Sequence, residues 1–369
     1  MIKKQKKVIV IGGGIHGLTS AIFLAKNGAK VTLLEKREEL MKGTSGATHN
    51  RAHMGYHYPR SIETAKECLQ GLTFFKKYYP QALFYPPNAY YLIDKNDSKT
   101  SLSSFKKFCA EIKIPYKIEK SNNNFWKKDK IQCGFKVSEP IFDVVLLTNL
   151  LKKEAGELGV KIINNSEVVD LKKLDSGYKI ISRELTGLKE YRADIILNAT
   201  YAYTNNILKI LGLEEDMAKY ELQKTEVVLV KSKKNLPALT VMDGNFISIM
   251  PLANAEKQNL FLIYDANYSV VDREDGYFLD DTKKYSTNFK KMIKHGEKYF
   301  PFMKELKYVK SLYGFRPIPK EIIDASRKTR IVSHKKSPGI YSIFEGKFIS
   351  APLIAEKLAK LMKKDGILT

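Results

Sequence analysis

The stretch VIVIGGGIHGLTSAIFLAKNGAKVTLLEK, residues 8–36, decides the fold of this chain because it sets out one complete structural unit in order. Val8–Ile11 is a short apolar run that predicts a buried strand, and three glycines follow it directly. Leu18–Asn27 carries apolar residues at helical spacing, and the next residue is a glycine suited to a helix C-terminus. A second apolar run, Val31–Leu34, predicts another strand and leads into Glu35.

Three of the glycines, Gly12, Gly14 and Gly17, fill a GxGxxG motif. In such a unit the first permits a tight turn, the second lets the backbone approach a pyrophosphate, and the third lets the helix pack closely on the strand. The helix N-terminus offers N–H groups to phosphates, and Glu35 is placed to accept hydrogen bonds from a ribose diol. All parts are in register, which favours a dinucleotide-binding unit over a simple glycine-rich turn. The expected contacts are Gly12, Gly14, Ile15, His16, Gly17, Glu35 and Lys36.

The composition is that of an ordinary globular protein. The 369 residues suffice for two domains, and 44% of them are hydrophobic. No apolar run approaches the roughly 20 residues needed to cross a bilayer, and the N-terminus leads into a strand instead of a signal-peptide core, so we expect a cytoplasmic location. Cys68, Cys109 and Cys133 lie far apart without metal-ligand spacing, which predicts reduced thiols, no disulfide framework and no zinc site.

The formal net charge of +23 raises the question of a nucleic-acid partner. Only nine of the 63 basic residues are arginine, and the lysines are spread along the whole length. Specific phosphate and base recognition favours the planar arginine fork, whereas dispersed lysine is typical of a solvated surface. We therefore expect no nucleic-acid partner and at most a peripheral contact with anionic membranes, through Lys3, Lys4, Lys6 and Lys7 or through Lys360, Lys363 and Lys364.

Beyond the N-terminal unit, β-rich stretches alternate with α/β stretches, and the sequence shows no internal repeat or low-complexity linker. This alternation predicts two interleaved domains instead of two consecutive ones. A nucleotide-binding domain is expected from residues 1–80, 141–222 and 310–369, and an inserted substrate domain from residues 81–140 and 223–309. Helices are expected at residues 61–79, 105–112 and 141–158 and at the end of the chain.

Four later parts of the chain, the last of them split in two, narrow the class of protein. They read GTSGATHNRAHMGYHYPRS (43–61), NNSEVVDL (164–171), ILNATYAYTNNI (196–207), and YGFRPIP (313–319) with PGIYSIFEGKFISAPLIAEKL (338–358). With the N-terminal unit, they resemble the FAD-dependent oxidoreductases of the D-amino-acid oxidase and glycine oxidase type. That superfamily also holds glycerol-3-phosphate dehydrogenases and L-2-hydroxyglutarate oxidases. The resemblance implies an α/β fold in which an FAD-binding, Rossmann-type domain with a parallel sheet carries an inserted β-rich (α+β) substrate domain.

The resemblance also implies FAD as the cofactor and further residues in contact with it. These are Thr44, Ser45, His49, Asn50, Val168, Ala199, Thr200, Gly346, Lys347 and Phe348. Lys347 is expected to face the flavin pyrimidine edge, where a positive charge would stabilise the reduced anionic flavin. The chain departs from the family pattern twice, because Tyr201 and Glu345 stand where glycine is usual.

Histidine is concentrated in one loop, at His49, His53 and His57. Oxidation of an alcohol requires removal of the hydroxyl proton, so we expect His53 or His57 to act as a general base. A helical metal site is disfavoured, because Gly55 and Pro59 interrupt a helix and no carboxylate or cysteine joins the histidines. His49 remains open as a covalent attachment point of the flavin, as in some relatives, or as a group that hydrogen-bonds the backbone or the cofactor.

Arg316 lies between Gly314 and Pro317, where an arginine can present a two-pronged donor to a carboxylate or phosphate. In the relatives this element holds the anionic group of the substrate. The sequence thus predicts an FAD-dependent dehydrogenase or oxidase that takes two electrons from a CH–OH or CH–NH group of a small anionic substrate, such as a 2-hydroxy acid, an amino acid or a polyol phosphate. The alternative is an FAD- or NAD-binding tailoring enzyme of sugar or nucleotide metabolism without net substrate oxidation. The electron acceptor stays open between oxygen, a quinone and a protein.

Overall fold

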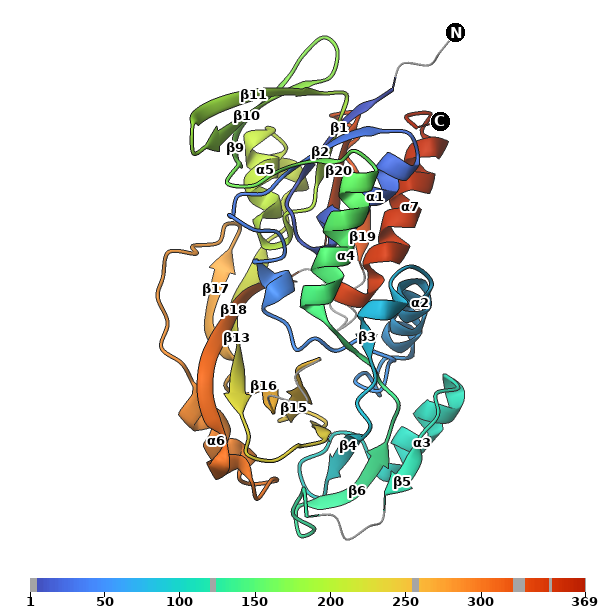
Figure 1. The fold of residues 1–369 in the computed structure, drawn as a ribbon, viewed down its shortest axis with the longest axis vertical. Helices are drawn as coiled ribbons and strands as arrows, with labels where there is room; N and C mark the ends of the chain where they lie inside the picture. The colour runs from blue at the N-terminus through green and yellow to red at the C-terminus, as the bar shows by residue number, and fades with distance from the viewer. Residues whose placement is uncertain (1–4, 120–123, 254–258, 321–328, 345–346, 369) are drawn as a thin grey trace.

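The structure is a computed structural model that describes residues 5–119, 124–253, 259–320, 329–344 and 347–368. Two large sheets occupy the two ends of an elongated molecule, and the first strand β1 and the last helix α7 both lie at the end that holds the first sheet (Figure 1). The predicted α/β fold with a parallel sheet is confirmed.

The first sheet has six strands in the order β19-β20-β12-β1-β2-β8. All neighbours are parallel except the edge strand β19, which runs antiparallel to β20. The carboxyl ends of β1 and β2 therefore meet at one edge, where the glycine turn and Glu35 lie. The bounds are β1 Lys7–Ile11, β2 Lys30–Leu34, β8 Lys161–Ile163, β12 Ile195–Asn198, β19 Arg330–Ser333 and β20 Ile340–Phe344.

Helices cover one face of this sheet, and α1 contacts both α4 and α7 there (Figure 1). Alternate strand residues such as Val8, Val10 and Leu33 point into this core. The bounds are α1 Ile15–Lys26, α2 Ile62–Tyr78, α4 Val144–Glu157 and α7 Ala351–Lys364. The predicted helix at 141–158 begins later because its first two residues pair in a short strand and the Asp143 carboxylate caps Leu146 N at 2.9 Å.

A three-stranded antiparallel sheet covers the opposite face. Ile9, Ile11 and Leu34 form a second core with residues of this sheet, among them Val168 and Ile180. The strands are β9 Glu167–Lys173, β10 Tyr178–Glu184 and β11 Gly187–Ala193, and helix α5 Thr204–Ile210 packs beside them.

The second large sheet has the order β17-β13-β16-β15-β14-β4-β6-β5, and β18 pairs with the long strand β13. Its strands are β4 Ala89–Asp94, β5 Lys117–Glu119, β6 Ile131–Lys136, β13 Tyr220–Lys231, β14 Ala238–Met242, β15 Ile247–Pro251, β16 Leu260–Asp265, β17 Val270–Gly276 and β18 Lys307–Pro319. The remaining elements are α3 Leu102–Glu111, α6 Phe289–Gly296, the strand pair β3 Leu83–Phe84 and β7 Ile141–Phe142, and the short 3-10 helices η1 Thr44–Gly46, η2 Pro80–Ala82, η3 Tyr201–Tyr203, η4 Glu214–Asp216, η5 Met303–Glu305 and η6 Phe348–Ser350.

The chain crosses between the two large sheets several times. The expected division at residue 310 falls inside β18, whose pairing with β13 ties it to the second sheet, so the strand pairing puts the change of sheet after Pro319. None of the helices in the described ranges is both long enough and apolar enough to cross a bilayer.

Candidate functional site

A cavity of about 720 Å³ extends from the carboxyl edge of the first sheet to β18 of the second. This volume lies in the range of small-molecule sites, roughly 300–1,000 Å³. The cavity brings together most of the residues singled out in the sequence, namely Gly12, Gly14, Ile15, His16, Glu35, Lys36, Thr44, Ser45, His49, His53, Val168, Ala199, Thr200, Arg316, Lys347 and Phe348.

Three of the predicted residues lie outside the cavity lining. Gly17 packs against the glycine turn, Asn50 is buried with its backbone N–H bonded to the Thr48 hydroxyl at 2.8 Å, and the His57 ring packs on Phe246 with 4.9 Å between centroids. Gly346 and Glu345 fall outside the described residues.

The glycine turn admits no larger residues at two of its positions. Gly12 has a φ of +104°, and a Cβ there would lie 2.7 Å from the Ala199 carbonyl oxygen. A Cβ on Gly17 would lie 1.8 Å from the Gly12 carbonyl oxygen. The turn can therefore form, and α1 can start against β1, only with glycine at both positions.

The N-terminus of α1 opens into the cavity beside two polar side chains. Ile15 N donates to Ser45 Oγ at 3.0 Å, so the η1 loop lies directly against the helix start. The buried Glu35 carboxylate accepts from Gly13 N at 2.6 Å and from Arg37 N at 2.9 Å. These two N–H groups fix the orientation of the carboxylate, and each oxygen keeps a further lone pair for a hydroxyl donor.

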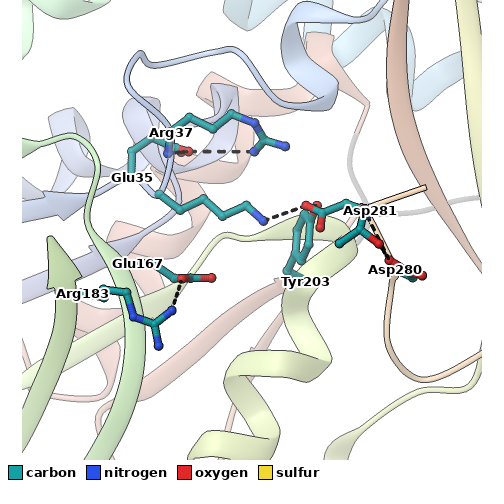
Figure 2. A network of polar contacts seen from close by, with 9 residues as sticks. Glu35, Arg37, Glu167, Arg183, Tyr203, Asp280 and Asp281 are labelled. Carbon is teal, nitrogen blue, oxygen red and sulfur yellow. Dashed lines mark hydrogen bonds and ion pairs between the residues drawn. The ribbon is translucent and has the colours of Figure 1, made fainter. Parts of the chain in front are cut away.

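Charged residues surround the same end of the cavity (Figure 2). Lys36 Nζ lies 3.1 Å from Asp281 Oδ2 and 3.6 Å from the centre of the Tyr203 ring. The Tyr203 hydroxyl donates to the same Asp281 oxygen, and burial together with this carboxylate raises the pKa of the phenol. On the other side Arg183 pairs with Glu167 at 3.3 Å. Asp281 follows β17, so a segment of the second domain is bound to the first at this point.

The imidazoles of His49 and His53 are held uncharged. Burial lowers the pKa of both rings well below 6.5, and the positive charge of Arg51 lowers it further. Burial also lowers the pKa of His16 to about 4. His49 Nδ1 lies 3.2 Å from Ser248 Oγ, whereas His49 Nε2 and His53 Nδ1 are buried without a hydrogen-bond partner in the described part of the chain. Neutral rings with an open nitrogen can accept a proton from a ligand.

Arg316 is held by neutral groups. Its Nε donates to Gln223 Oε1 at 2.8 Å, its Nη2 donates to the same oxygen, and its Nη1 donates to the Tyr264 hydroxyl at 3.2 Å. No carboxylate of the described residues forms an ion pair with it. A guanidinium with amide and phenol partners keeps its full charge for a ligand in the cavity.

The sequence reasoning missed a buried guanidinium in the cavity wall, that of Arg51. Arg51 is buried and bonded to the hydroxyls of Tyr91 and Thr240, and its Nη1 lies 3.5 Å from Glu139 Oε2. Its position between two histidines of the loop was the available signal, but Glu139 and Thr240 are distant in sequence. Lys347 is also paired, with 2.6 Å between its Nζ and Glu67 Oε2.

The family model described as DAO, FAD dependent oxidoreductase, matches residues 7–361. The chain belongs to this family. It is 25% identical to the FAD-dependent monooxygenase kojA of Aspergillus flavus, over 98% of the chain and 86% of that protein. Its fold is similar to that of the L-α-glycerophosphate oxidase of Mycoplasma pneumoniae with FAD bound, with a TM-score of 0.76, 20% identity, and coverage of 98% and 95% of the two chains. The glycine oxidase of Geobacillus kaustophilus has a TM-score of 0.71 at 16% identity, with coverage of 98% and 95%.

The cavity of this DAO family member fits FAD. The glycine turn and the start of α1 form a cradle that a single Cβ would fill. The Glu35 carboxylate lies at the edge of this cradle, where it accepts from Gly13 N. His49 Nε2, His53 Nδ1 and Asn206 Oδ1 are buried polar atoms of the cavity lining that lack hydrogen-bond partners among the described residues. Because buried polar atoms are nearly always bonded, such atoms are suited to hydrogen-bonding a cofactor in the cavity. No group of three potential metal ligands occurs within the described ranges.

Of the two residues that depart from the family pattern, Tyr201 and Glu345, the structure describes Tyr201. Tyr201 adopts a φ of +56°, in the left-handed region that glycine enters at no cost, so glycine is the expected residue there for a physical reason. Tyr201 nevertheless lines the cavity at the start of η3. Glu345 lies outside the described residues.

Proposed function

We propose that this FAD-dependent oxidoreductase oxidises a CH–OH or CH–NH group of a small anionic substrate, such as a 2-hydroxy acid, an amino acid or a polyol phosphate. The observation that supports this most is the Arg316 guanidinium, which lines the cavity with a neutral amide and a phenol as its partners. An uncompensated guanidinium in a partly buried site binds carboxylate or phosphate strongly.

Different residues are proposed to hold different parts of FAD. Gly12, Gly14 and Ile15 line the proposed pyrophosphate site at the start of α1. There the Ser45 hydroxyl, which accepts from Ile15 N, can donate its proton to a phosphate oxygen, and Glu35 accepts from the adenosine ribose. His16, Lys36, Thr44, His49, Val168, Ala199, Thr200, Lys347 and Phe348 complete the wall around the cofactor. When bound, FAD supplies a two-electron acceptor that takes a hydride at N5.

We propose that a histidine of the loop accepts the hydroxyl proton of an alcohol substrate. For an alcohol substrate, the C–H bond breaks with its electron pair leaving as hydride, and the O–H proton passes to a base as the carbonyl forms. His53 is the better candidate of the two proposed bases, because it lines the cavity with an unpartnered buried Nδ1 whereas His57 packs behind it. His49 offers its open Nε2 to the cofactor or the substrate.

Anaerobic reduction of the bound flavin tests the proposal. The purified protein is expected to show the visible spectrum of oxidised flavin and to lose it on mixing with one member of a panel of 2-hydroxy acids, amino acids and glycerol phosphates. The Arg316→Leu variant should retain flavin but need about 100-fold or more substrate for the same reduction. If every anionic substrate fails to reduce the flavin, or if Arg316→Leu leaves the apparent affinity unchanged, the proposal is wrong.

Oxygen, a quinone and a protein are the three candidate electron acceptors. One relative carries the name monooxygenase and another the name glycerol 3-phosphate oxidase, which belong to those proteins. Reoxidation of the reduced protein in air, followed by assay for hydrogen peroxide and for an oxygenated product, separates an oxidase from a monooxygenase. Slow reoxidation in air favours a quinone or a protein.

A further inference from the structure

We infer that Gln223 is a positioning residue that fixes Arg316 and restricts the site to ligands with two anionic oxygens on one atom, as in a carboxylate or phosphate. The inference rests on the proposed function, because it assigns the orientation of the group proposed to bind the substrate. Its basis is the pairing of β13 with β18, which brings the two side chains together.

Gln223 and Arg316 are direct partners in the antiparallel register of these strands. Gln223 is 7% exposed, and its single Oε1 accepts from both Nε and Nη2 of the guanidinium. Two donors converging on one acceptor lock the guanidinium along its side edge. The plane of the group is thus set by a neighbouring strand and not by the ligand.

The group that holds Arg316, the side-chain amide of Gln223, carries no charge. Gln223 Nε2 donates to the Glu221 carboxylate, which also lies 3.4 Å from Arg273 Nη1. Arg273 therefore offsets the charge of Glu221, and the amide of Gln223 stands between that carboxylate and Arg316. A glutamate in place of Gln223 would fit the same space but would neutralise Arg316.

The bonds to Gln223 also determine which N–H donors of Arg316 remain available to a ligand. A guanidinium has five N–H groups, of which Gln223 takes the one on Nε and one on Nη2, while Tyr264 takes one on Nη1. One N–H on each terminal nitrogen is left. We infer that Tyr264 takes the Nη1 hydrogen on the Cδ side, so that the two remaining N–H groups form an end-on pair. A pair of this kind matches two oxygens on one carbon or phosphorus atom, and it gives no matched partner to a neutral alcohol.

The test compares three FAD-loaded variants, Gln223→Glu, Gln223→Leu and Gln132→Glu. Gln132 lies exposed on β6 of the same sheet, so its substitution is a matched control for the added charge. Acetate and inorganic phosphate serve as non-reacting probes and are titrated against the visible spectrum of the bound flavin. The Kd for both probes should rise about 100-fold in Gln223→Glu and about tenfold in Gln223→Leu, and it should not change in Gln132→Glu.

Two further readouts separate orientation from simple damage. Gln223→Leu should raise KM for the anionic substrate with kcat within about threefold of the wild type, since uniform binding is lost and the reacting groups are intact. Gln223→Glu should also lose its preference for an anionic substrate over the neutral alcohol of the same carbon skeleton. Flavin content and melting temperature report whether each variant folds. If Gln223→Glu does not fold, the Kd values of Gln223→Leu alone test whether Gln223 positions Arg316.

The failure of this inference can be told from the failure of the proposed function. If Arg316→Leu abolishes probe binding while both Gln223 variants bind the probes within threefold of the wild type, Gln223 does not position Arg316 and the proposed function stands. If Arg316→Leu also binds the probes normally, the anion lies elsewhere and both are overturned.

Discussion

The Thr44 hydroxyl and the backbone of Phe315 form a reciprocal pair of hydrogen bonds, in which Thr44 Oγ1 donates to the Phe315 carbonyl at 3.0 Å and accepts from Phe315 N at 3.1 Å. Thr44 begins η1, the loop that meets the start of α1. Phe315 is the residue before Arg316 on β18. One side chain therefore joins the loop proposed to hold the cofactor to the strand proposed to hold the substrate.

Replacing Thr44 by valine removes both bonds at nearly constant volume. We expect KM for the anionic substrate, or the Kd of acetate, to rise about tenfold, because two hydrogen bonds worth about 0.5–1.5 kcal/mol each are lost. Steady-state kinetics and probe titration measure the change. Thr73→Val is the control, since that exposed hydroxyl donates to the Leu69 carbonyl within α2. Equal behaviour of the two variants would show that the Thr44 bonds do not set the position of Arg316.

The base can be assigned by comparing His53→Asn with His57→Asn. Loss of a general base typically costs about 10²–10⁴-fold in kcat, and we expect this for His53→Asn and a smaller loss for His57→Asn. Stopped-flow flavin reduction measures the step directly. A larger loss in His57→Asn would assign the role to His57 instead.

The same assignment predicts the pH dependence of flavin reduction. Burial, with the nearby charges of His57 and Arg51, lowers the pKa of His53 well below 6.5, so the ring is neutral and able to accept a proton throughout the neutral range. The rate should be independent of pH above 6.5 and should fall only at lower pH, where the base becomes protonated. A rate that keeps rising between pH 7 and pH 9 would contradict a histidine with a lowered pKa.

Asp281 binds a segment of the second domain to Lys36 and Tyr203, two residues of the cavity wall. We expect Asp281→Asn to speed FAD release about fivefold, because a partly exposed ion pair contributes about 0.2–1 kcal/mol. The rise of flavin fluorescence after dilution measures the release rate. Asp280→Asn is the matched control, because the Asp280 carboxylate accepts from the backbone N–H and the hydroxyl of Thr282, and Asp280 lies beside Asp281 (Figure 2). Identical release rates in the two variants would rule out a role for the Asp281 contacts.

The buried pair of Arg51 and Glu139 should matter for stability in a way that surface pairs do not. Glu139→Gln leaves the buried guanidinium without its counter-charge, which typically costs about 3–5 kcal/mol in the free energy of unfolding. Urea unfolding at pH 7 measures the loss. Glu157→Gln, which removes an exposed pair with Lys153 at 3.8 Å, should cost less than about 0.5 kcal/mol. A comparable loss in both variants would mean that burial does not set the contribution of Glu139.

The sequence was sufficient where structure is set by neighbours along the chain. The β1-α1-β2 unit follows from apolar spacing, from glycines that no other residue can replace, and from an acid at the end of the second strand. Helix α2 follows from Ser61, which caps Thr64 N as a serine at a helix start commonly does. Each of these signals lies within a few residues of its effect.

The sequence was insufficient where contacts depend on strand register. Gln223 meets Arg316 only because β13 and β18 pair over their whole length, and no local pattern marks either residue as the partner of the other. The same holds for Glu139, which reaches Arg51 from a distant segment. The conformation of Asn50 was also not predictable from the sequence. Its φ of +55° shows that it is a turn residue of the loop, which the residue type alone did not reveal.

The interleaving of the two sheets also constrains how the protein is made. The edge of β12 is covered by β20, and that of β13 by β18, and both covering strands come from the last part of the chain. As the polypeptide leaves the ribosome, these buried edges stay unpaired until β18 and β20 have been synthesised, and an open strand edge invites pairing with other chains. Early termination of translation should therefore yield aggregating fragments, and not a smaller soluble enzyme.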